Sequence, residues 1–446
     1  MRITRRSMLG GSAALAATPA MTRVAQLTDG GGRALAPTPP MGWNSWNSFA
    51  TTITEEQALE QATIMARELL PSGYDIFTVD IQWYEPNASS YEYDSSPVPT
   101  MDGYGRLLPA PNRFPSSVNG AGFLPLAERV NALGLKFAVH LMRGIPRLAV
   151  EHDLPVLGTN TTAGAIADRS STCSWNPDMY GVDMTKPGAQ AYYDSVFVLM
   201  AEWKVDFVKV DDLSRPYDDH VPEIEAIRRA MDNSGRPMVL SMSPGETPVY
   251  RGHHAGTHSQ MWRISDDFWD DWRMLDAQFT RLANWNPFMG EGGWPDADML
   301  PLGRLALGDR DTNFTPDEQR TLMTLWSIAR SPLIMGGDLR YLDAPTKALL
   351  TNPEVLAVNQ SSRLNQPHFV QDFVHIWSAR AADGGTYVAL FNPQDHPASV
   401  GIDLAVLGLG GTRPVRDLWT RQADGSATRR FERTIPSHGA GLYKLS

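Results

Sequence analysis

Residues able to act as acids, bases or nucleophiles stand at the ends of short apolar segments in this 446-residue chain. In the segment 205–213, an alternating apolar run typical of a buried strand ends in Lys209, Asp211 and Asp212. A fold does not need two carboxylates beside a lysine there, whereas an enzyme with its chemistry at the C-terminal ends of barrel strands does. Asp212 fits the cap of the next helix, so Asp211 is the candidate reactive group.

Further acids stand at other expected strand ends, and tryptophans surround them. The acids are Asp80, Asp266, Asp267, Asp296 and Asp298, and the tryptophans are Trp43, Trp46, Trp83, Trp262, Trp269, Trp272 and Trp294. This combination is typical of sugar binding, because the apolar face of a pyranose packs on an indole while its hydroxyls need charged partners. Trp46 is the better candidate for sugar contact, since Trp269 and Trp272 fall inside an expected helix, where core packing explains them.

Two carboxylates on opposite sides of one pocket suffice for glycoside hydrolysis. One attacks the anomeric carbon and the other protonates the leaving oxygen, about 5 to 5.5 Å apart when configuration is retained. Lys209, on the same strand face as Asp211, would keep that carboxylate ionised. A metal-dependent hydrolase built on Asp211, Asp212 and His220 is a weaker alternative, because His220 is expected in the following loop.

Eight strand and helix pairs are expected to position these side chains. The expected strands lie near 37–46, 74–80, 135–141, 205–213, 237–243, 261–265, 299–302 and 333–336. Their alternation with helices predicts an α/β fold, a closed (β/α)8 TIM barrel over residues 37–357. Thr54 and Gln57 form a capping box for the first long helix. Long loops at 81–117 and 142–186 lie on the face where barrels build binding sites.

The two ends of the chain differ from the barrel. In residues 358–446, short apolar runs separated by turn residues predict an all-β antiparallel sandwich domain packed directly on the barrel. In residues 1–36, Arg5 and Arg6 precede a short apolar run, which is typical of a twin-arginine-type signal peptide and too short for a permanent membrane span. We therefore expect an exported, periplasmic or secreted protein without a membrane anchor.

Composition excludes other classes of protein. The net charge of −11 argues against a nucleic-acid partner, whose phosphates require a basic surface. With Cys173 as its single cysteine, the chain cannot form an intramolecular disulfide, and the surrounding residues do not match a zinc-ligand spacing. The sequence carries no signal for an oligomeric state.

Five motifs together resemble the melibiase-type α-galactosidases, a family of retaining glycoside hydrolases. They are Pro40-Met-Gly-Trp-Asn-Ser-Trp46, Lys209-x-Asp211, Trp262-Arg-x-x-x-Asp267, Trp294-Pro-Asp-Ala-Asp-Met-Leu300 and Ser331-Pro-Leu-Ile334. The likeness extends from about residue 37 to the end of the chain, including Val415-Arg-Asp-Leu-Trp419 in the expected sandwich.

The resemblance implies roles for individual residues. It makes Asp211 the nucleophile and Asp267 the acid/base, with Asp266 as the rival for that second role. It further implies sugar contacts from Trp46, Asp80, Lys209, Arg263 and Asp298. The resemblance implies no cofactor and no metal.

The chain departs from the family pattern at three sugar-binding positions. Ile81 replaces the second of two adjacent aspartates that hold the hydroxyls identifying galactose, and Ser243 replaces a glutamate that contacts the 2-hydroxyl. His140 stands in place of a tyrosine, as either a ligand contact or a packed core residue, and Arg143 could replace a lost contact. The catalytic pair is therefore better defined than the sugar.

These features predict an exported retaining α-glycosidase acting on an oligosaccharide or glycoside, with α-galactosidase activity favoured. An alternative keeps the mechanism but changes the sugar, as in isomalto-dextranases and β-L-arabinopyranosidases. A carbohydrate-binding protein without catalysis is the alternative from another class, and the survival of both acids argues against it.

Overall fold

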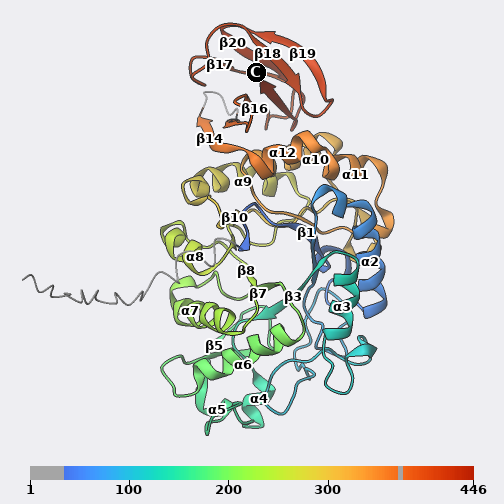
Figure 1. Ribbon diagram of the computed structural model, residues 1–446, viewed down its shortest axis with the longest axis vertical. Coiled ribbons are helices and arrows are strands. Elements are labelled where there is room, and N and C mark those ends of the chain that lie inside the picture. The colour runs from blue at the N-terminus through green and yellow to red at the C-terminus, as the bar shows by residue number, and fades with distance from the viewer. Residues whose placement is uncertain (1–34, 370–374) are drawn as a thin grey trace, which may run out of the picture.

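A computed structural model describes residues 35–369 and 375–446 (Figure 1). The signal peptide predicted at residues 1–36 falls almost entirely outside the described residues, so it stays a prediction. None of the helices in the described part of the chain combines the length and apolar character that a membrane span needs.

Eight parallel strands form one curled sheet in the order β10-β9-β8-β7-β3-β2-β1-β13. Their bounds are β1 (Met41–Asn44), β2 (Ile76–Val79), β3 (Lys136–Met142), β7 (Phe207–Asp211), β8 (Val239–Met242), β9 (Met261–Arg263), β10 (Trp294–Asp296) and β13 (Leu333–Met335). Leu300, just after β10, bonds to Ile334 and Gly336 beside β13. The sheet therefore closes, and the predicted barrel is confirmed, with its helices on the outside (Figure 1).

Seven of these strands overlap the predicted segments. The eighth, β10, ends before the segment predicted near 299–302, in which Leu300 forms a parallel bridge to Met335 of β13. Strand β10 contains Pro295, a residue that argues against a strand. Trp294 N–H donates to Gln260, and the carbonyl of Asp296 accepts from Ile264. Because Trp294 and Asp296 make the backbone hydrogen bonds to the chain on either side of β9, Pro295 needs no N–H of its own for this pairing.

Helices pack around the sheet because each has one apolar face. They include α2 (Glu55–Glu68), α3 (Leu124–Ala132), α6 (Ala189–Glu202), α7 (Tyr217–Asn233), α8 (Gly252–His258), α9 (Trp272–Trp285) and α10 (Pro316–Ile328). Helix α2 begins at the predicted capping box, in which Thr54 and Gln57 satisfy each other's backbone N–H groups. Its inward face buries Ala58, Ala62 and Met65, so the same residues that define the helix attach it to the barrel.

Both long loops lie where the sequence predicts them, and the second has its own secondary structure. Residues 142–186 contain the short helices α4 (Arg147–Glu151) and α5 (Ala163–Ile166). They also contain a three-stranded sheet of β4 (Ile145–Pro146), β6 (Met179–Val182) and β5 (Ala167–Thr172). The stretch between β1 and α2 holds the short helix α1 (Trp46–Phe49).

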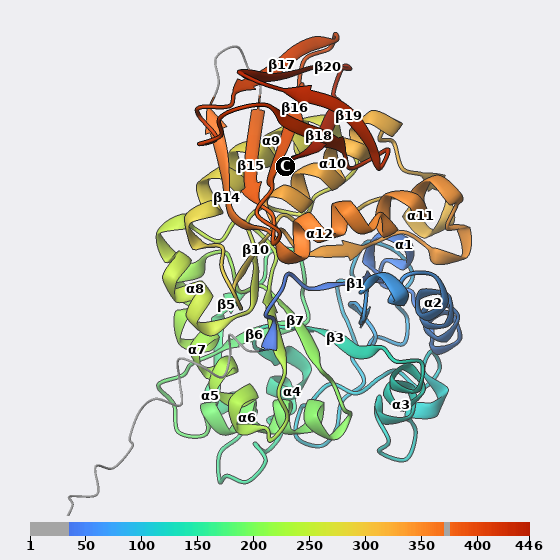
Figure 2. The ribbon, with the colours of Figure 1, turned by 45° about the horizontal axis from the view of Figure 1, so that its top comes forward.

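The C-terminal strands are antiparallel, as predicted, and follow α11 (Ala344–Thr351) and α12 (Pro353–Ser361). They are β14 (Arg363–Phe369), β15 (His375–Arg380), β16 (Thr386–Phe391), β17 (Ala398–Asp403), β18 (Arg413–Asp417), β19 (Gln422–Ala427), β20 (Arg430–Ile435) and β21 (Ala440–Leu445). Figure 1 shows this unit above α9, α10 and α12, and in the turned view of Figure 2 its strands lie across α9 and α10. Thr321 of α10 donates to the carbonyl of His438, whose ring stacks on Trp272 with centroids 3.8 Å apart.

Candidate active site

Polar side chains from β3, β7 and the end of β8 meet around Asp211. His140 lies opposite Lys209 in the parallel ladder, and its Nε2 is 3.2 Å from Oδ2 of Asp211. Ser243 donates its hydroxyl to Oδ1 of Asp211. Nζ of Lys209 lies 3.8 Å from Asp211 Oδ1 and 3.0 Å from Asp80 Oδ2. The structure thus brings these predicted site residues together.

The surroundings of Asp211 favour its ionised form. Burial by itself would raise the pKa of Asp211, but the positive charge of Lys209, followed by His140 and the Ser243 hydroxyl, outweighs burial and holds this pKa well below its usual range. Only 10% of the Asp211 side chain is exposed. A buried, ionised carboxylate at a strand end can attack a bound electrophile at neutral pH.

We expect Lys209→Met to move the acidic limb of the pH profile of kcat/KM to higher pH. Removing the ammonium leaves burial to dominate, so the pKa of Asp211 rises and a smaller fraction of the nucleophile is ionised at a given acidic pH. The pH dependence of kcat/KM checks this. Lys204→Met, which removes a surface lysine paired with Glu128, should leave the limb in place, and an unmoved limb in Lys209→Met would contradict the assignment.

Asp80 is fixed on the same side of the pocket by three donors. Asn44 donates its side-chain amide to Oδ2 at 2.7 Å, beside Lys209, and the backbone N–H of Ile81 donates to Oδ1 at 2.9 Å. Asp80 and Ile81 are each about 1% exposed. The position after Asp80 is therefore a buried apolar one, without any acceptor for a sugar hydroxyl.

A second acidic group surrounds Arg263 at the end of β9. Nη2 of Arg263 lies 2.9 Å from Asp298 and 3.2 Å from Asp267, and Asp298 also accepts from the backbone N–H of Phe268. Burial raises the pKa of Asp298, although the charge of Arg263 opposes this. Asp298 thereby orients Arg263 and the loop that carries Asp267.

The two rivals for the acid/base role differ in their contacts. The side chain of Asp267 is 52% exposed and touches Arg263, which is 2% exposed. Asp266 is 60% exposed and pairs at 2.9 Å with Arg215, itself more than half exposed. Of the two acids, Asp267 faces the buried site, while Asp266 belongs to a surface ion pair.

Lys209 and Tyr93 are each influenced by both candidate catalytic acids. Burial lowers the pKa of Lys209, but the charges of Asp211, Asp80 and Asp267 outweigh it and raise that pKa. Burial raises the pKa of Tyr93, and the same three carboxylates raise it further. Because Asp211 ends β7 and Asp267 follows β9, both acids stand at the C-terminal end of the barrel.

Aromatic residues from the first long loop line the approach to Trp46. Trp46 is stacked on Tyr93, with centroids 6.3 Å apart, and meets Tyr91 edge-on at 5.4 Å. Tyr91 in turn contacts Trp269, which precedes α9 rather than lying inside a helix. The sequence analysis did not single out Tyr91 or Tyr93 as site residues. The available signal was that both lie in the long loop 81–117, on the face where barrels build binding sites.

The remaining tryptophans divide between core and domain contact. Four of them are fully buried, namely Trp43, Trp83, Trp262 and Trp294, so they support the barrel and do not reach a ligand. Trp272, the first residue of α9, packs on the C-terminal unit through His438.

Arg143 does not replace a lost sugar contact, and Asp212 does not cap a helix. The guanidinium of Arg143, about 2% exposed, lies 2.7 Å from Asp212 and 2.6 Å from Glu223 of α7. Helix α7 begins at Tyr217, after Pro216, and receives no cap from Asp212. Both predictions are wrong because the partner in α7 is remote in sequence, and together these residues join the end of β7 to the outer helix.

We expect Arg143→Met to lower the free energy of unfolding by about 3–5 kcal/mol, because it leaves Asp212 and Glu223 buried without their counter-ion. Urea denaturation followed by tryptophan fluorescence measures the change. Arg229→Met removes an exposed arginine of α7 that donates to Gln190, and it should cost less than about 0.5 kcal/mol. Equal losses in the two variants would refute this account.

The alternative metal site at Asp211, Asp212 and His220 is not assembled among the described residues. His220 lies inside α7 rather than in a loop, and its Nδ1 is 3.4 Å from the carbonyl of Leu213. Burial, assisted by the charge of Arg143, lowers the pKa of His220 to about 4. Asp212 is already paired with Arg143.

Both parts of the chain match known protein families. Residues 158–361 match the family model described as alpha galactosidase A, and residues 371–445 match that of the alpha galactosidase C-terminal beta sandwich domain. An alpha-galactosidase of Cyamopsis tetragonoloba is 28% identical over 419 residues, which cover 92% of this chain and 87% of that protein.

Two bacterial crystal structures are more similar. A GH27 β-L-arabinopyranosidase from Geobacillus stearothermophilus shares 47% identity with a TM-score of 0.92, covering 93% of this chain and 98% of that one. A putative alpha-N-acetylgalactosaminidase from Bacillus halodurans C-125 also shares 47% identity, with a TM-score of 0.83 and coverage of 92% and 97%.

Proposed function

The chain belongs to glycoside hydrolase family 27, the family of the retaining α-galactosidases, and from this we propose that it hydrolyses β-L-arabinopyranosides, with α-D-galactosides as a second substrate class. The expected retaining glycosidase activity is thereby confirmed at the level of the family. The choice of sugar rests on the pocket, and above all on Ile81.

In the proposed mechanism, the carboxylate of Asp211 attacks the anomeric carbon while Asp267 gives its proton to the departing glycosidic oxygen. Asp267 then takes a proton from water, which hydrolyses the bond between the sugar and Asp211 and restores both acids. The burial of Asp211 beside Lys209 supports its role as nucleophile. The exposure of Asp267, with Arg263 at 3.2 Å, supports exchange of a proton with the aglycone and with water.

Ile81 is the observation that favours an arabinopyranoside. β-L-Arabinopyranose has the ring configuration of α-D-galactopyranose at C2, C3 and C4, but it lacks the hydroxymethyl group at C6. Family α-galactosidases hold galactose with two adjacent acids, and this chain has Asp80 followed by the buried Ile81. If the hydroxyl at C6 of galactose is left without its acceptor, binding is weakened by about 1–3 kcal/mol. Arabinopyranose has no hydroxyl at C6 and so incurs no such cost.

The test is a comparison of kcat/KM for p-nitrophenyl β-L-arabinopyranoside, α-D-galactopyranoside, α-N-acetylgalactosaminide and α-D-glucopyranoside. We expect the arabinopyranoside to be hydrolysed at least about ten-fold better than the galactoside, as one lost hydrogen bond implies. NMR of the first-formed sugar should show the anomer of the substrate. A higher kcat/KM for any of the other three glycosides would overturn the proposed sugar.

We expect Ile81→Asp to move the preference towards the galactoside by about ten-fold or more, because it restores an acceptor beside Asp80. The ratio of the two kcat/KM values measures this. Ile81→Val keeps the position apolar and should leave the ratio within about three-fold. A ratio unchanged in Ile81→Asp would show that this position does not select the sugar.

The second substrate class, α-D-galactosides, is supported by the shared motifs and by the similarity to the alpha-galactosidase of Cyamopsis tetragonoloba.

We also propose that the chain is exported, a proposal supported by Arg5, Arg6 and the apolar run after them. Replacing both arginines by lysine should retain the protein in the cytoplasm, and unchanged export in that variant would refute the signal.

A further inference from the structure

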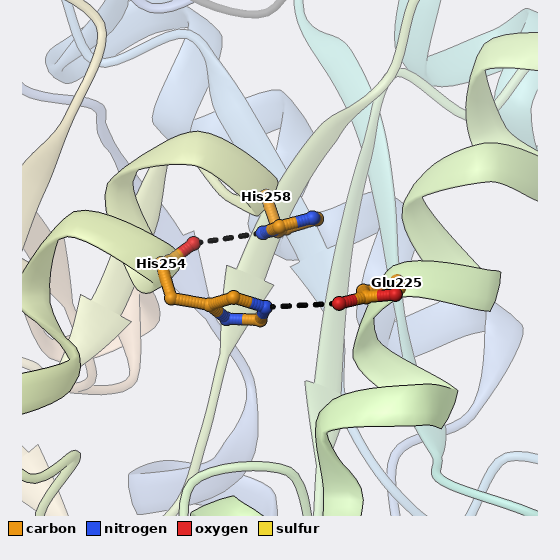
Figure 3. Close-up of side chains that lie close together, drawn as sticks. All are labelled: Glu225, His254 and His258. Carbon is orange, nitrogen blue, oxygen red and sulfur yellow. Dashed lines mark hydrogen bonds and ion pairs between the residues drawn. The ribbon is translucent and has the colours of Figure 1, made fainter.

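A group of three potential metal ligands lies on the outer helices, apart from the strand ends that carry the pocket. It consists of Glu225 on α7 and of His254 and His258 on α8 (Figure 3). One ligand atom from each residue lies within 4.8 Å of the other two. The side chains of His254 and Glu225 are 19% and 45% exposed, so an ion from solvent can reach them.

The helix places both histidines on one face. They are four residues apart on α8, so their side chains are neighbours, and their rings are stacked with centroids 4.1 Å apart. Nδ1 of His258 is 2.9 Å from the backbone carbonyl of His254. Because a carbonyl can only accept, Nδ1 carries a proton, and in the neutral ring Nε2 then offers its lone pair on the side that faces α7 (Figure 3).

His254 has a partner on each side of its ring. Its Nε2 is 3.4 Å from Oε1 of Glu225, and its Nδ1 is 2.8 Å from the hydroxyl of Tyr217. In the neutral ring, either Nδ1–H donates to Tyr217 or Nε2–H donates to Glu225. In the first arrangement the lone pair of Nε2 faces the Glu225 carboxylate, so a cation can bind between them, and the bond to Tyr217 is the kind of outer hydrogen bond that fixes the orientation of a ligating imidazole.

The separation of these atoms suits a small transition-metal ion. Ligands at the zinc distances of about 2.0–2.2 Å in a tetrahedron lie about 3.3–3.5 Å from one another, and the His254 and Glu225 atoms are 3.4 Å apart. We propose that Glu225, His254 and His258 bind one divalent transition-metal ion, with water completing its coordination. Two imidazoles and one carboxylate select ions such as Zn²⁺, Ni²⁺ or Cu²⁺ over Mg²⁺ and Ca²⁺.

A bound ion would also affect the stability of the fold. The ion would join α7 to α8, the helix that leads into β9 and Arg263, so binding would raise the thermal stability of the whole chain.

The experiment is a titration of the chelator-treated full-length chain with ZnCl₂, followed by calorimetry and by metal analysis after dialysis. We expect one Zn²⁺ per chain, a Tm that rises with Zn²⁺ concentration, and no effect of MgCl₂. His254→Ala and Glu225→Gln should each weaken Zn²⁺ binding about 100-fold or more, and Tyr217→Phe, which keeps all three ligands, about ten-fold. Co²⁺ bound to the wild type should give the visible bands of a tetrahedral site.

His253→Ala is the matched control, because His253 lies on the same helix but faces Phe288, with ring centroids 5.2 Å apart. That variant should bind Zn²⁺ as the wild type does. Circular dichroism of the metal-free variants establishes that they are folded. Wild-type affinity in both His254→Ala and Glu225→Gln, or an equal loss in His253→Ala, would overturn the proposal.

Discussion

Asp211→Asn should lower kcat on nitrophenyl glycosides by about 10⁴-fold or more, while the protein keeps its fold. The amide is nearly the same size as the carboxylate but cannot attack the anomeric carbon, so no glycosyl-enzyme intermediate forms. Steady-state kinetics and the Tm measure the two expectations. Ser243 can still bond to the side-chain oxygen of the variant, which is why the fold should tolerate the change.

Asp206→Asn is the control for this experiment. Asp206 lies at the other end of the same strand, just before β7, where it pairs with Arg236. Its replacement should leave kcat unchanged within about two-fold, since it is remote from the pocket. If Asp211→Asn kept more than about one hundredth of the wild-type kcat, Asp211 would not be the nucleophile.

Asp267→Ala should lower kcat/KM by about 10²- to 10⁴-fold on alkyl or disaccharide substrates, whose leaving oxygen needs a proton. On a 2,4-dinitrophenyl glycoside the loss should be much smaller, because that leaving group departs without protonation. Azide, which needs no base, should accelerate the second step and give a glycosyl azide with the anomeric configuration of the substrate. Kinetics across a leaving-group series, with product analysis by NMR, checks both expectations.

Asp266→Ala separates the two neighbouring acids. Its exposed carboxylate pairs with Arg215, so its removal should change activity by no more than about two-fold on every leaving group. The reverse pattern, with leaving-group dependence in Asp266→Ala and none in Asp267→Ala, would exchange the two roles.

The barrel was predictable because its signals are local. A strand buried on both faces is a continuous apolar run, the Thr54 and Gln57 box marks a helix start, and side chains at strand ends share one face. The grouping of Asp80, Lys209 and Asp211 followed from this geometry alone. The assignment of individual roles needed the resemblance to a family.

The errors concern partners that are distant in sequence. Asp212 was expected to act locally, yet its partner Arg143 is 69 residues away, and the other partner of Arg143, Glu223, is 80 residues away. Tyr93 reaches Trp46 only because a long loop folds back over the strand ends. Hydrophobic periodicity and capping motifs report only on neighbours in sequence, so they cannot predict contacts of this kind; the folded structure is needed to identify them.

The stacked contact between Trp272 and His438 joins the C-terminal unit to the helix that follows Asp267. The loop that carries Asp267 leads directly into α9. Trp272, the first residue of this helix, stacks on His438, whose Nδ1 and Nε2 lie 2.8 and 2.9 Å from Glu318 and Asp395. In the proposed mechanism, the sandwich therefore helps to hold the proton donor in position. We expect a barrel truncated after residue 357 to retain Asp211 and Asp267 but to lose the contact that positions Asp267.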